Sequence, residues 1–549
     1  MIVFPIFASV VSRSLAAEHL AGSNHPGLQS SKPASTTMPT LFDISGRLDV
    51  LTLSGFGMDH QYGLTIDGRP TGISRSTLSP LSFAGDTTSM DELSFQFTSK
   101  ATRGPRYHGE FIIGNTIGTP TAPYAGFGSQ STPQPGTPFV SSSFSGYLQD
   151  LSMITSKTAH GTEIGMELGR FGERFGPLFL QRTNVAPYFV NERWNNGAYY
   201  LDGARFYATG KFGKATLVAA TSNMSGSVFG FGPVQPLVSS AGAMFSTAGF
   251  TSGRPQGLSG SALFQVHNIV GLDWKSDIPR FGTAQLTYLK LGASSFPTST
   301  TDPLVTPTLA DSQQVYGLQV NGTVLGFPVR MAYAKSDLFR QSASINSKDN
   351  VAAYAEADAN LGPVKGTIGF RQIDAQFGAP GDWGRIGDWW NPVGIKGSYT
   401  SLSYSPTRFL TLVTTADTQN GTGDGQLISY YQGDFESKAG LSSADTLTHY
   451  RVGVQLAPGA KSGLGVGADT ATYSLAGQPS FGYPATSPVA HWYDVSYFYE
   501  WGDRSRLSVL FELSDYNSGN SNNTFEAFPG LNQPNAKGGL VAMQYTYRF

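Results

Sequence analysis

The densest mixture of charged and aromatic side chains lies between Gly169 and Asn196 (GRFGERFGPLFLQRTNVAPYFVNERWNN). Such a mixture suits a loop whose apolar side packs on a wall while its charged side faces a passage, because rings of charge at a constriction set which ions pass. The arginine excess favours a weak preference for anions, although the charges could instead pair with one another on an outer loop. The residues predicted to line a constriction are Arg170, Arg174, Arg182, Glu192 and Arg193.

The rest of the sequence gives little support for a catalytic site or a metal site. The eight histidines are scattered, and no pair has the spacing of metal ligands on a helix face or a strand face. No nucleophile motif joins a strand to a helix, and the absence of cysteine removes thiolate chemistry. His108 and Glu110 are two residues apart, but such a pair is far more often a hydrogen bond than a catalytic dyad. We therefore expect no enzyme activity, no cofactor and no metal site.

Composition limits the class of protein. Charged residues make up 13% of the chain, against about 25% in soluble domains. A net charge of −2 argues against nucleic acid as a partner, since binding phosphates requires a basic surface. No apolar run reaches the roughly 18 residues that a membrane helix needs. An all-β chain with one apolar face and one polar face reconciles membrane residence with a mean hydropathy of −0.16.

Segments of about ten residues that alternate between polar and apolar side chains recur throughout, which indicates β-strands. In 162–171, for example, Ile164 and Met166 oppose Glu163 and Glu167. The predicted strands are 41–54, 91–100, 106–114, 144–156, 162–171, 199–209, 214–222, 261–275, 280–291, 313–325, 329–337, 350–360, 364–373, 395–405, 408–418, 447–457, 463–474, 491–502, 506–516 and 538–549.

Short and long connections alternate between these segments, from the short 101–105 and 157–161 to the long 115–143 and 172–198. A transmembrane barrel sorts its connections in this way, with short periplasmic turns and long extracellular loops. An open edge would leave backbone groups unpaired in hydrocarbon, each costing several kcal/mol. We therefore predict an all-β fold, a closed transmembrane antiparallel β-barrel of about twenty strands, with eighteen as the alternative.

The polar faces of the strands would then line a lumen, since a charge placed toward lipid at the midplane costs about 2–4 kcal/mol. The residues predicted for the lumen wall are Arg47, Glu110, Arg205, Arg330, Arg371 and Arg451. The long stretches 223–260, 419–446 and 517–537 are predicted to be outer loops. Residues 382–390 (DWGRIGDWW) carry three tryptophans, which fit an outer interfacial belt or a sugar-stacking site.

The last strand carries a more specific signal. Tyr545, Tyr547 and Phe549 share one face, while Gln544 and Thr546 occupy the other. A terminal strand with alternate aromatics and a final phenylalanine resembles that of the outer-membrane β-barrel proteins of Gram-negative bacteria, whose assembly machinery reads it. The resemblance implies location in the cell outer membrane, with membrane lipid and the barrel assembly machinery as partners.

The stretch 172–198 resembles the third loop of porins, which narrows the pore. The Gly169–Phe171 run, Phe175-Gly176 and Glu192-Arg193 resemble, more locally, the phosphate-selective porin family. These resemblances imply a homotrimeric porin for passive diffusion of small hydrophilic solutes and ions. Two alternatives stay open: a substrate-specific channel for an oligosaccharide or phosphate, and an adhesin or scaffold barrel with a closed lumen.

The start of the chain is organised differently. Met1–Val11 is apolar but lacks a preceding positive charge, so we interpret 1–17 as a signal-peptide remnant, with a buried strand or short helix as the alternative. Residues 18–40 are rich in Ser, Thr and Pro and are predicted to be a flexible periplasmic lead-in. The barrel is predicted to occupy 41–549.

Overall fold

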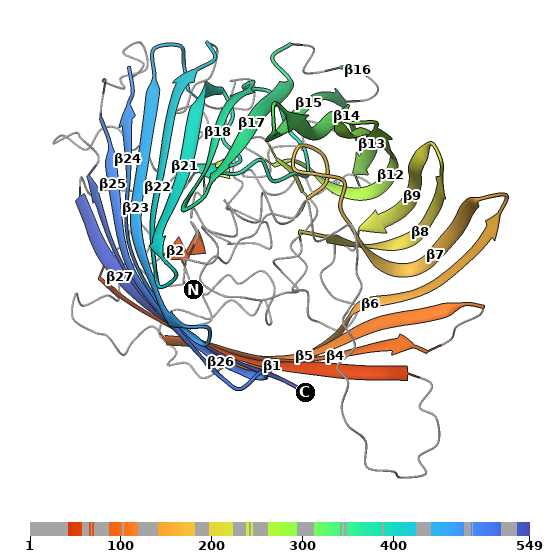
Figure 1. Cartoon of the computed structure of the whole chain (residues 1–549), viewed down its shortest axis with the longest axis horizontal. Coiled ribbons are helices and arrows are strands. Elements are labelled where there is room, and N and C mark those ends of the chain that lie inside the picture. The colour runs from red at the N-terminus through yellow and green to blue at the C-terminus, as the bar shows by residue number, and fades with distance from the viewer. Residues whose placement is uncertain are drawn as a thin grey trace, which may run out of the picture.

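Twenty antiparallel strands close into one barrel, which confirms the predicted fold class and strand count. Figure 1 shows the strands following one another around a single ring. The computed structural model describes residues 42–57, 65–66, 69–70, 87–100, 104–118, 141–181, 197–222, 238–240, 243–244, 262–293, 312–340, 343–344, 348–386, 389–423, 441–476, 485, 487–517 and 535–549. The predicted remnant at 1–17 and lead-in at 18–40 lie outside these residues. Among the described residues, none forms a helix long and apolar enough to cross a membrane.

Most barrel strands are longer than the sequence pattern predicts, and β6 is the longest at 19 residues, whereas β13, β14, β17 and β18 have the predicted lengths. Their bounds are β1 (Phe42–Gly57), β4 (Thr87–Ser99), β5 (Arg106–Gly118), β6 (Ser141–Ala159), β7 (Thr162–Glu173), β8 (Tyr199–Gly210), β9 (Gly213–Ser222), β12 (Ala262–Ile278), β13 (Gly282–Ala293), β14 (Ser312–Val324), β15 (Phe327–Arg340), β17 (Val351–Leu361), β18 (Val364–Ile373), β21 (Ile395–Thr407), β22 (Leu410–Gly421), β23 (Thr446–Gly459), β24 (Ser462–Ser474), β25 (Val489–Trp501), β26 (Ser505–Asn517) and β27 (Asn535–Arg548).

Shorter pieces lie outside the closed ring: β2 (Thr65–Ile66), β3 (Arg69–Pro70), β10 (Val238–Ser240), β11 (Ala243–Met244), β16 (Ala343–Ser344), β19 (Arg385–Ile386) and β20 (Trp389–Trp390). At one end of the barrel the strands are joined by tight turns. His160-Gly161 and Leu325-Gly326 are two-residue turns in which both residues have positive φ. Such turns match the twist of the strands that they connect, so the predicted short connections are confirmed at these places.

The seam between the first and last strands closes the barrel. Along it, Val50 pairs with Tyr545 and Leu48 with Tyr547. The backbones of Gly46 and Phe549 exchange hydrogen bonds of 3.1 and 3.0 Å. The Phe549 ring lies over Gly46, where a Cβ atom would be 2.2 Å from the ring and 2.8 Å from the backbone oxygen of Ser94. The final phenylalanine therefore needs a glycine beneath it.

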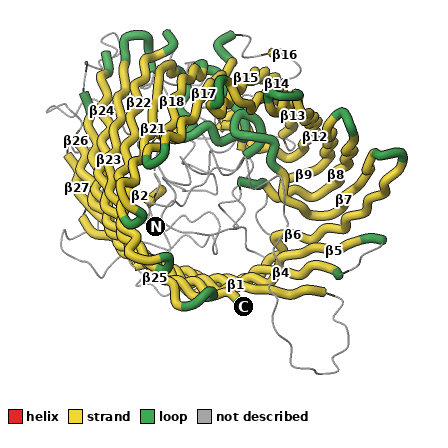
Figure 2. The backbone as a smooth tube through the Cα atoms, viewed as in Figure 1, coloured by secondary structure: helices red, strands yellow, loops and turns green. Residues whose placement is uncertain are grey.

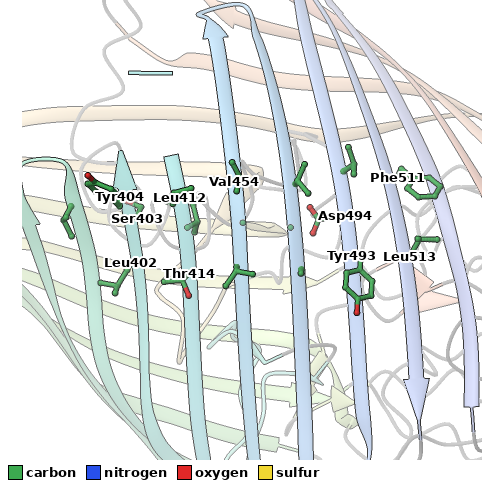
Figure 3. A pocket seen from close by; sticks show the side chains of 18 residues that line it. Leu402, Ser403, Tyr404, Leu412, Thr414, Val454, Tyr493, Asp494, Phe511 and Leu513 are labelled. Atoms are coloured by element: carbon green, nitrogen blue, oxygen red, sulfur yellow. The ribbon is translucent and has the colours of Figure 1, made fainter. Parts of the chain in front are cut away.

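The two faces of the barrel wall differ as the period-two pattern predicts. In β27, Gln544 and Thr546 are buried toward the interior while Met543 is 45% exposed on the outer face. Large apolar side chains are exposed on the outside all around the ring, including Ile164 and Val452. An apolar groove of about 700 Å³ runs over the outer face of β21 to β26, between side chains such as Leu412 and Tyr493 (Figure 3). So much exposed apolar surface requires lipid around it.

The contact between Phe549 and Gly46 gives a test of barrel closure. We expect Gly46→Ala to destabilise the barrel by about 1–3 kcal/mol through overpacking. The folded fraction after refolding into detergent, measured as the heat-modifiable band on a gel, should fall. Gly459→Ala is the matched control, because a Cβ at Gly459 meets nothing within 4 Å. Equal folded fractions for the two variants would contradict the role of this contact.

Candidate functional site: an interior constriction

Two chain segments fold into the barrel, where Figure 2 shows green loop inside the ring of yellow strands. They are Arg174–Gln181, which follows β7, and residues 374–386 and 389–394, between β18 and β21. Phe179, Phe377 and Trp383 from these segments belong to one buried apolar cluster with inward residues of β8 to β25, such as Leu201 and Ile373. The inner wall is therefore apolar where these strands approach the long connections, and the sequence-based expectation of a polar wall fails there.

The first segment makes a tight turn and attaches to the wall. Its backbone closes through a hydrogen bond of 2.9 Å from Phe175 N to Leu180 O. The Gln285 side chain donates a 2.8 Å hydrogen bond to Phe175 O. Gly176 has a φ of +141°, and a Cβ there would lie 2.7 Å from Oε1 of Gln319. The described part of the predicted constriction loop thus lies inside the barrel against β13 and β14.

The second segment braces the first. Gln181 N donates to Pro380 O at 2.9 Å, and Asp382 N donates to Pro177 O at 2.8 Å. Where they meet, a Cβ on Gly381 would lie 2.2 Å from Pro177 O, so only glycine fits. These contacts join residues about two hundred positions apart into one constriction element, Arg174–Gln181 together with 374–386 and 389–394.

Trp383 lies in the core of this element. Its ring is 4% exposed and packs edge-on against Phe377 at a centroid distance of 5.2 Å. Its Nε1 donates to Pro392 O at 3.0 Å, and the Asn391 side chain accepts from Trp383 N at 2.8 Å. The predicted outer belt is therefore wrong for Trp383, because this loop turns inward and buries the ring. The side chains of Trp389 and Trp390 lie outside the described residues.

A third segment joins through its backbone. β11, from the stretch predicted to be an outer loop at 223–260, pairs with β20, which in turn pairs with β19. Ala243 is opposite Trp390 and Met244 is opposite Trp389. This small sheet ties another connection to the constriction element. The sequence gives no warning of it, since two-residue strands carry no periodicity.

The polar groups of the constriction element form a chain from a base to an acid. Arg174 Nε donates to Gln181 Oε1 at 3.0 Å, and Gln181 Nε2 donates to Asp382 Oδ2 at 3.4 Å. Burial lowers the pKa of the Arg174 guanidinium, and the opposing effect of Asp382 is smaller. An arginine remains cationic at any physiological pH, so this site presents one positive and one negative group.

Below the constriction element, the inner wall carries ion-pair networks. Arg205 contacts Glu167 and, at 3.2 Å, Glu173, and it lies over the Phe171 ring. Arg205 on β8 pairs with acids of the neighbouring strand β7, and Arg330 on β15 pairs with acids of the neighbouring strand β17. The other networks are Arg330 with Glu356 and Asp358, Arg371 with Asp417, Arg451 with Asp469 and Asp494, and Arg47 with Asp49.

The predicted site residues fall into three groups. Those of the lumen wall all lie on the inner face: Arg47, Glu110, Arg205, Arg330, Arg371 and Arg451. Of the predicted constriction residues, Arg174 lies in the constriction element, and Arg182, Glu192 and Arg193 lie outside the described residues. Arg170 shares the outer-face register with Ile164 and pairs with Leu151, which is 43% exposed, and with Asp202 at 3.6 Å. It therefore does not line the passage.

Sequence reasoning missed that the connection between β18 and β21 folds inward, and it did not predict which carboxylate pairs with which arginine. The composition of this connection could have indicated its burial, because aromatic residues with Gly and Pro in a long connection favour burial more than solvent exposure. Among the described residues, no three histidine or carboxylate side chains converge so as to hold a metal ion.

Comparisons with known proteins give local and distant similarities. Residues 280–423 match the family model of the β-barrel domain of the S-layer protein SlpA. A search of curated proteins found no match. The fold is similar to Pseudomonas aeruginosa OccK5 (OpdH), at 11% identity and a TM-score of 0.41 over 92% of this chain and 98% of that one.

Two structures from Acinetobacter baumannii are similar over 92% of this chain. OccAB3 has 9% identity and a TM-score of 0.40 over 100% of its own chain. The outer membrane channel DcaP has 8% identity and a TM-score of 0.31 over 97% of its chain. With identities and scores this low, function has to be argued from the residues of this chain.

The close approach at Gly381 gives a test of the bracing between the two segments. Gly381→Ala should displace Pro177 and weaken the 2.8 Å hydrogen bond that Asp382 N donates to it. We expect the free energy of unfolding in urea to fall by about 1–3 kcal/mol. Gly459→Ala, which meets no neighbour, should change it by less than about 0.5 kcal/mol. Similar values for the two variants would show that the segments do not support each other.

Proposed function

We propose that this chain is an outer-membrane channel through which small hydrophilic solutes and ions diffuse passively. One observation carries the proposal: the barrel is closed, with an apolar outer face and charged networks on its inner wall. The outer face needs lipid, and the inner networks need water or ions beside them. The constriction element narrows the passage near the long connections and sets the size of solute that passes.

The location and assembly of the protein belong to the same proposal. Tyr545, Tyr547 and Phe549 form the terminal signal for the barrel assembly machinery, and their position at the closing seam supports this role. The partners are outer-membrane lipid, the assembly machinery and the solutes themselves. The homotrimer rests on the porin resemblance of 172–198 alone.

Two other functions remain as outcomes of the test. A substrate-specific channel for an oligosaccharide or phosphate would share this architecture. A scaffold barrel is supported by the match of 280–423 to the barrel domain of an S-layer protein, and by the buried apolar packing of the constriction element. In that case the lumen would be closed.

Planar-bilayer recordings of the refolded full chain separate these functions. Open steps on the order of a nanosiemens in 1 M KCl support the general channel, and block of those steps by one added solute supports the specific channel. Silent bilayers containing folded, inserted protein would contradict both channels and favour the scaffold.

A substitution of Trp383 tests whether the constriction element limits the conductance of the channel. Trp383→Ala removes a buried ring at a cost of about 3–5 kcal/mol to the packing of the element. We expect a higher open conductance with more frequent fluctuations. The control is Trp274→Ala, because that ring is 39% exposed and lies on the outer face of β12. Unchanged single-channel traces for Trp383→Ala would show that the element does not narrow the passage.

A further inference from the structure

The arginines of the inner wall are held by more carboxylates than are needed to neutralise them. Six arginines and nine carboxylates form ion pairs around the described wall. Arg47 pairs with Asp49, Arg371 with Asp417 and Arg506 with Glu500. Three networks have a second acid: Arg205 with Glu167 and Glu173, Arg330 with Glu356 and Asp358, and Arg451 with Asp469 and Asp494.

These second carboxylates lie on well-separated parts of the ring, on β7, β17 and β25. Asp358 accepts a 2.6 Å hydrogen bond from Thr367 as well as the pairing with Arg330. Asp494 is 2% exposed, and its Oδ2 atom has no hydrogen-bond donor among the described residues. A buried carboxylate oxygen without a donor retains the capacity to accept a cation.

Neighbouring charges do not reverse this excess. His449 contacts Asp469 at 2.6 Å, and Arg385 of the constriction element interacts electrostatically with the same carboxylate. Arg174 is balanced by Asp382. Elsewhere on the inner face lie the bases Arg106, Lys214, Lys275, Lys365 and Arg548. The acids there include Asp43, Glu92, Glu110, Asp150, Glu163, Asp273, Asp277 and Glu512.

A narrow passage through a low-dielectric wall concentrates the field of its net charge, which raises the local concentration of counter-ions and lowers that of co-ions. Resting on the proposed channel function, we propose that the passage favours small cations over anions, and that Glu173, Asp358 and Asp494 are the residues that set this selectivity. This reverses the weak anion preference that the arginines of 169–196 indicate in sequence. The structure removes part of the basis for that preference, because Arg170 lies on the outer face and Arg174 is matched by Asp382.

The test uses the full chain in planar bilayers under a tenfold KCl gradient at pH 8. The wild-type reversal potential should report a potassium-to-chloride permeability ratio of about three or more. The triple variant Glu173→Gln, Asp358→Asn, Asp494→Asn keeps the size of each side chain and should bring the ratio close to one. Asp503→Asn is the matched control, since that side chain is 99% exposed on a turn, and it should leave the ratio unchanged.

A variant that removes a positive charge distinguishes an electrostatic effect from a structural one. Arg330→Gln removes a positive charge from a network with two acids, so it should move the reversal potential further toward cations, opposite to the triple variant. A wild-type ratio at or below one, or a triple variant with the wild-type ratio, would overturn this inference while leaving the channel function intact. Silent bilayers would overturn the proposed channel and the selectivity together.

Discussion

Backbone hydrogen bonding in hydrocarbon is the constraint on which this structure depends. A strand edge facing lipid has no water to satisfy its N–H and C=O groups, so a sheet that crosses a membrane must close on itself. Here closure is made by β1 and β27, whose pairing runs from Arg47 opposite Arg548 to Gly57 opposite Gly538. The seam ends where the backbones of Gly46 and Phe549 pair and the terminal ring covers the glycine. The pairing of β1 with β27 therefore satisfies the backbone groups of the first and the last strand at the same time.

Closure gives the wall an apolar outer face and a largely polar inner face. The interior is arranged according to which side chains are buried at each inner position. Arginines and carboxylates pair within a strand, between neighbouring strands or two strands apart, and this pairing stabilises charged groups away from bulk water. Near the long connections the inner face turns apolar, and there the constriction element packs through Phe179, Phe377 and Trp383. Charged networks border this apolar cluster, since Arg205 lies over the ring of Phe171, which belongs to the cluster.

The constriction element also explains why two distant connections behave as one unit. Backbone groups of Gln181 and Asp382 are satisfied by Pro380 and Pro177, each on the opposite segment. Neither segment could bury its polar backbone alone without leaving donors unpaired. The wall completes the set, since the side chains of Gln285 and Gln313 donate to the carbonyls of Phe175 and Gly378. The shape of the passage is accordingly determined by long-range contacts more than by either loop.

The sequence by itself determined the barrel, its strand number and the face on which each wall residue lies, because period-two alternation ties every side chain to lipid or lumen through local geometry. That is why the alternation predicts the inner face for Arg330 and Arg451 without any knowledge of their partners. The same alternation puts Arg170 on the outer face with Ile164, although a role in the constriction was predicted for it. Only the tertiary structure decided that Trp383 turns inward, and that Asp358 and Asp494 share arginines with other acids. Those outcomes depend on which strands become neighbours and which loops meet across the lumen, and such contacts between distant residues leave no periodic trace in the chain.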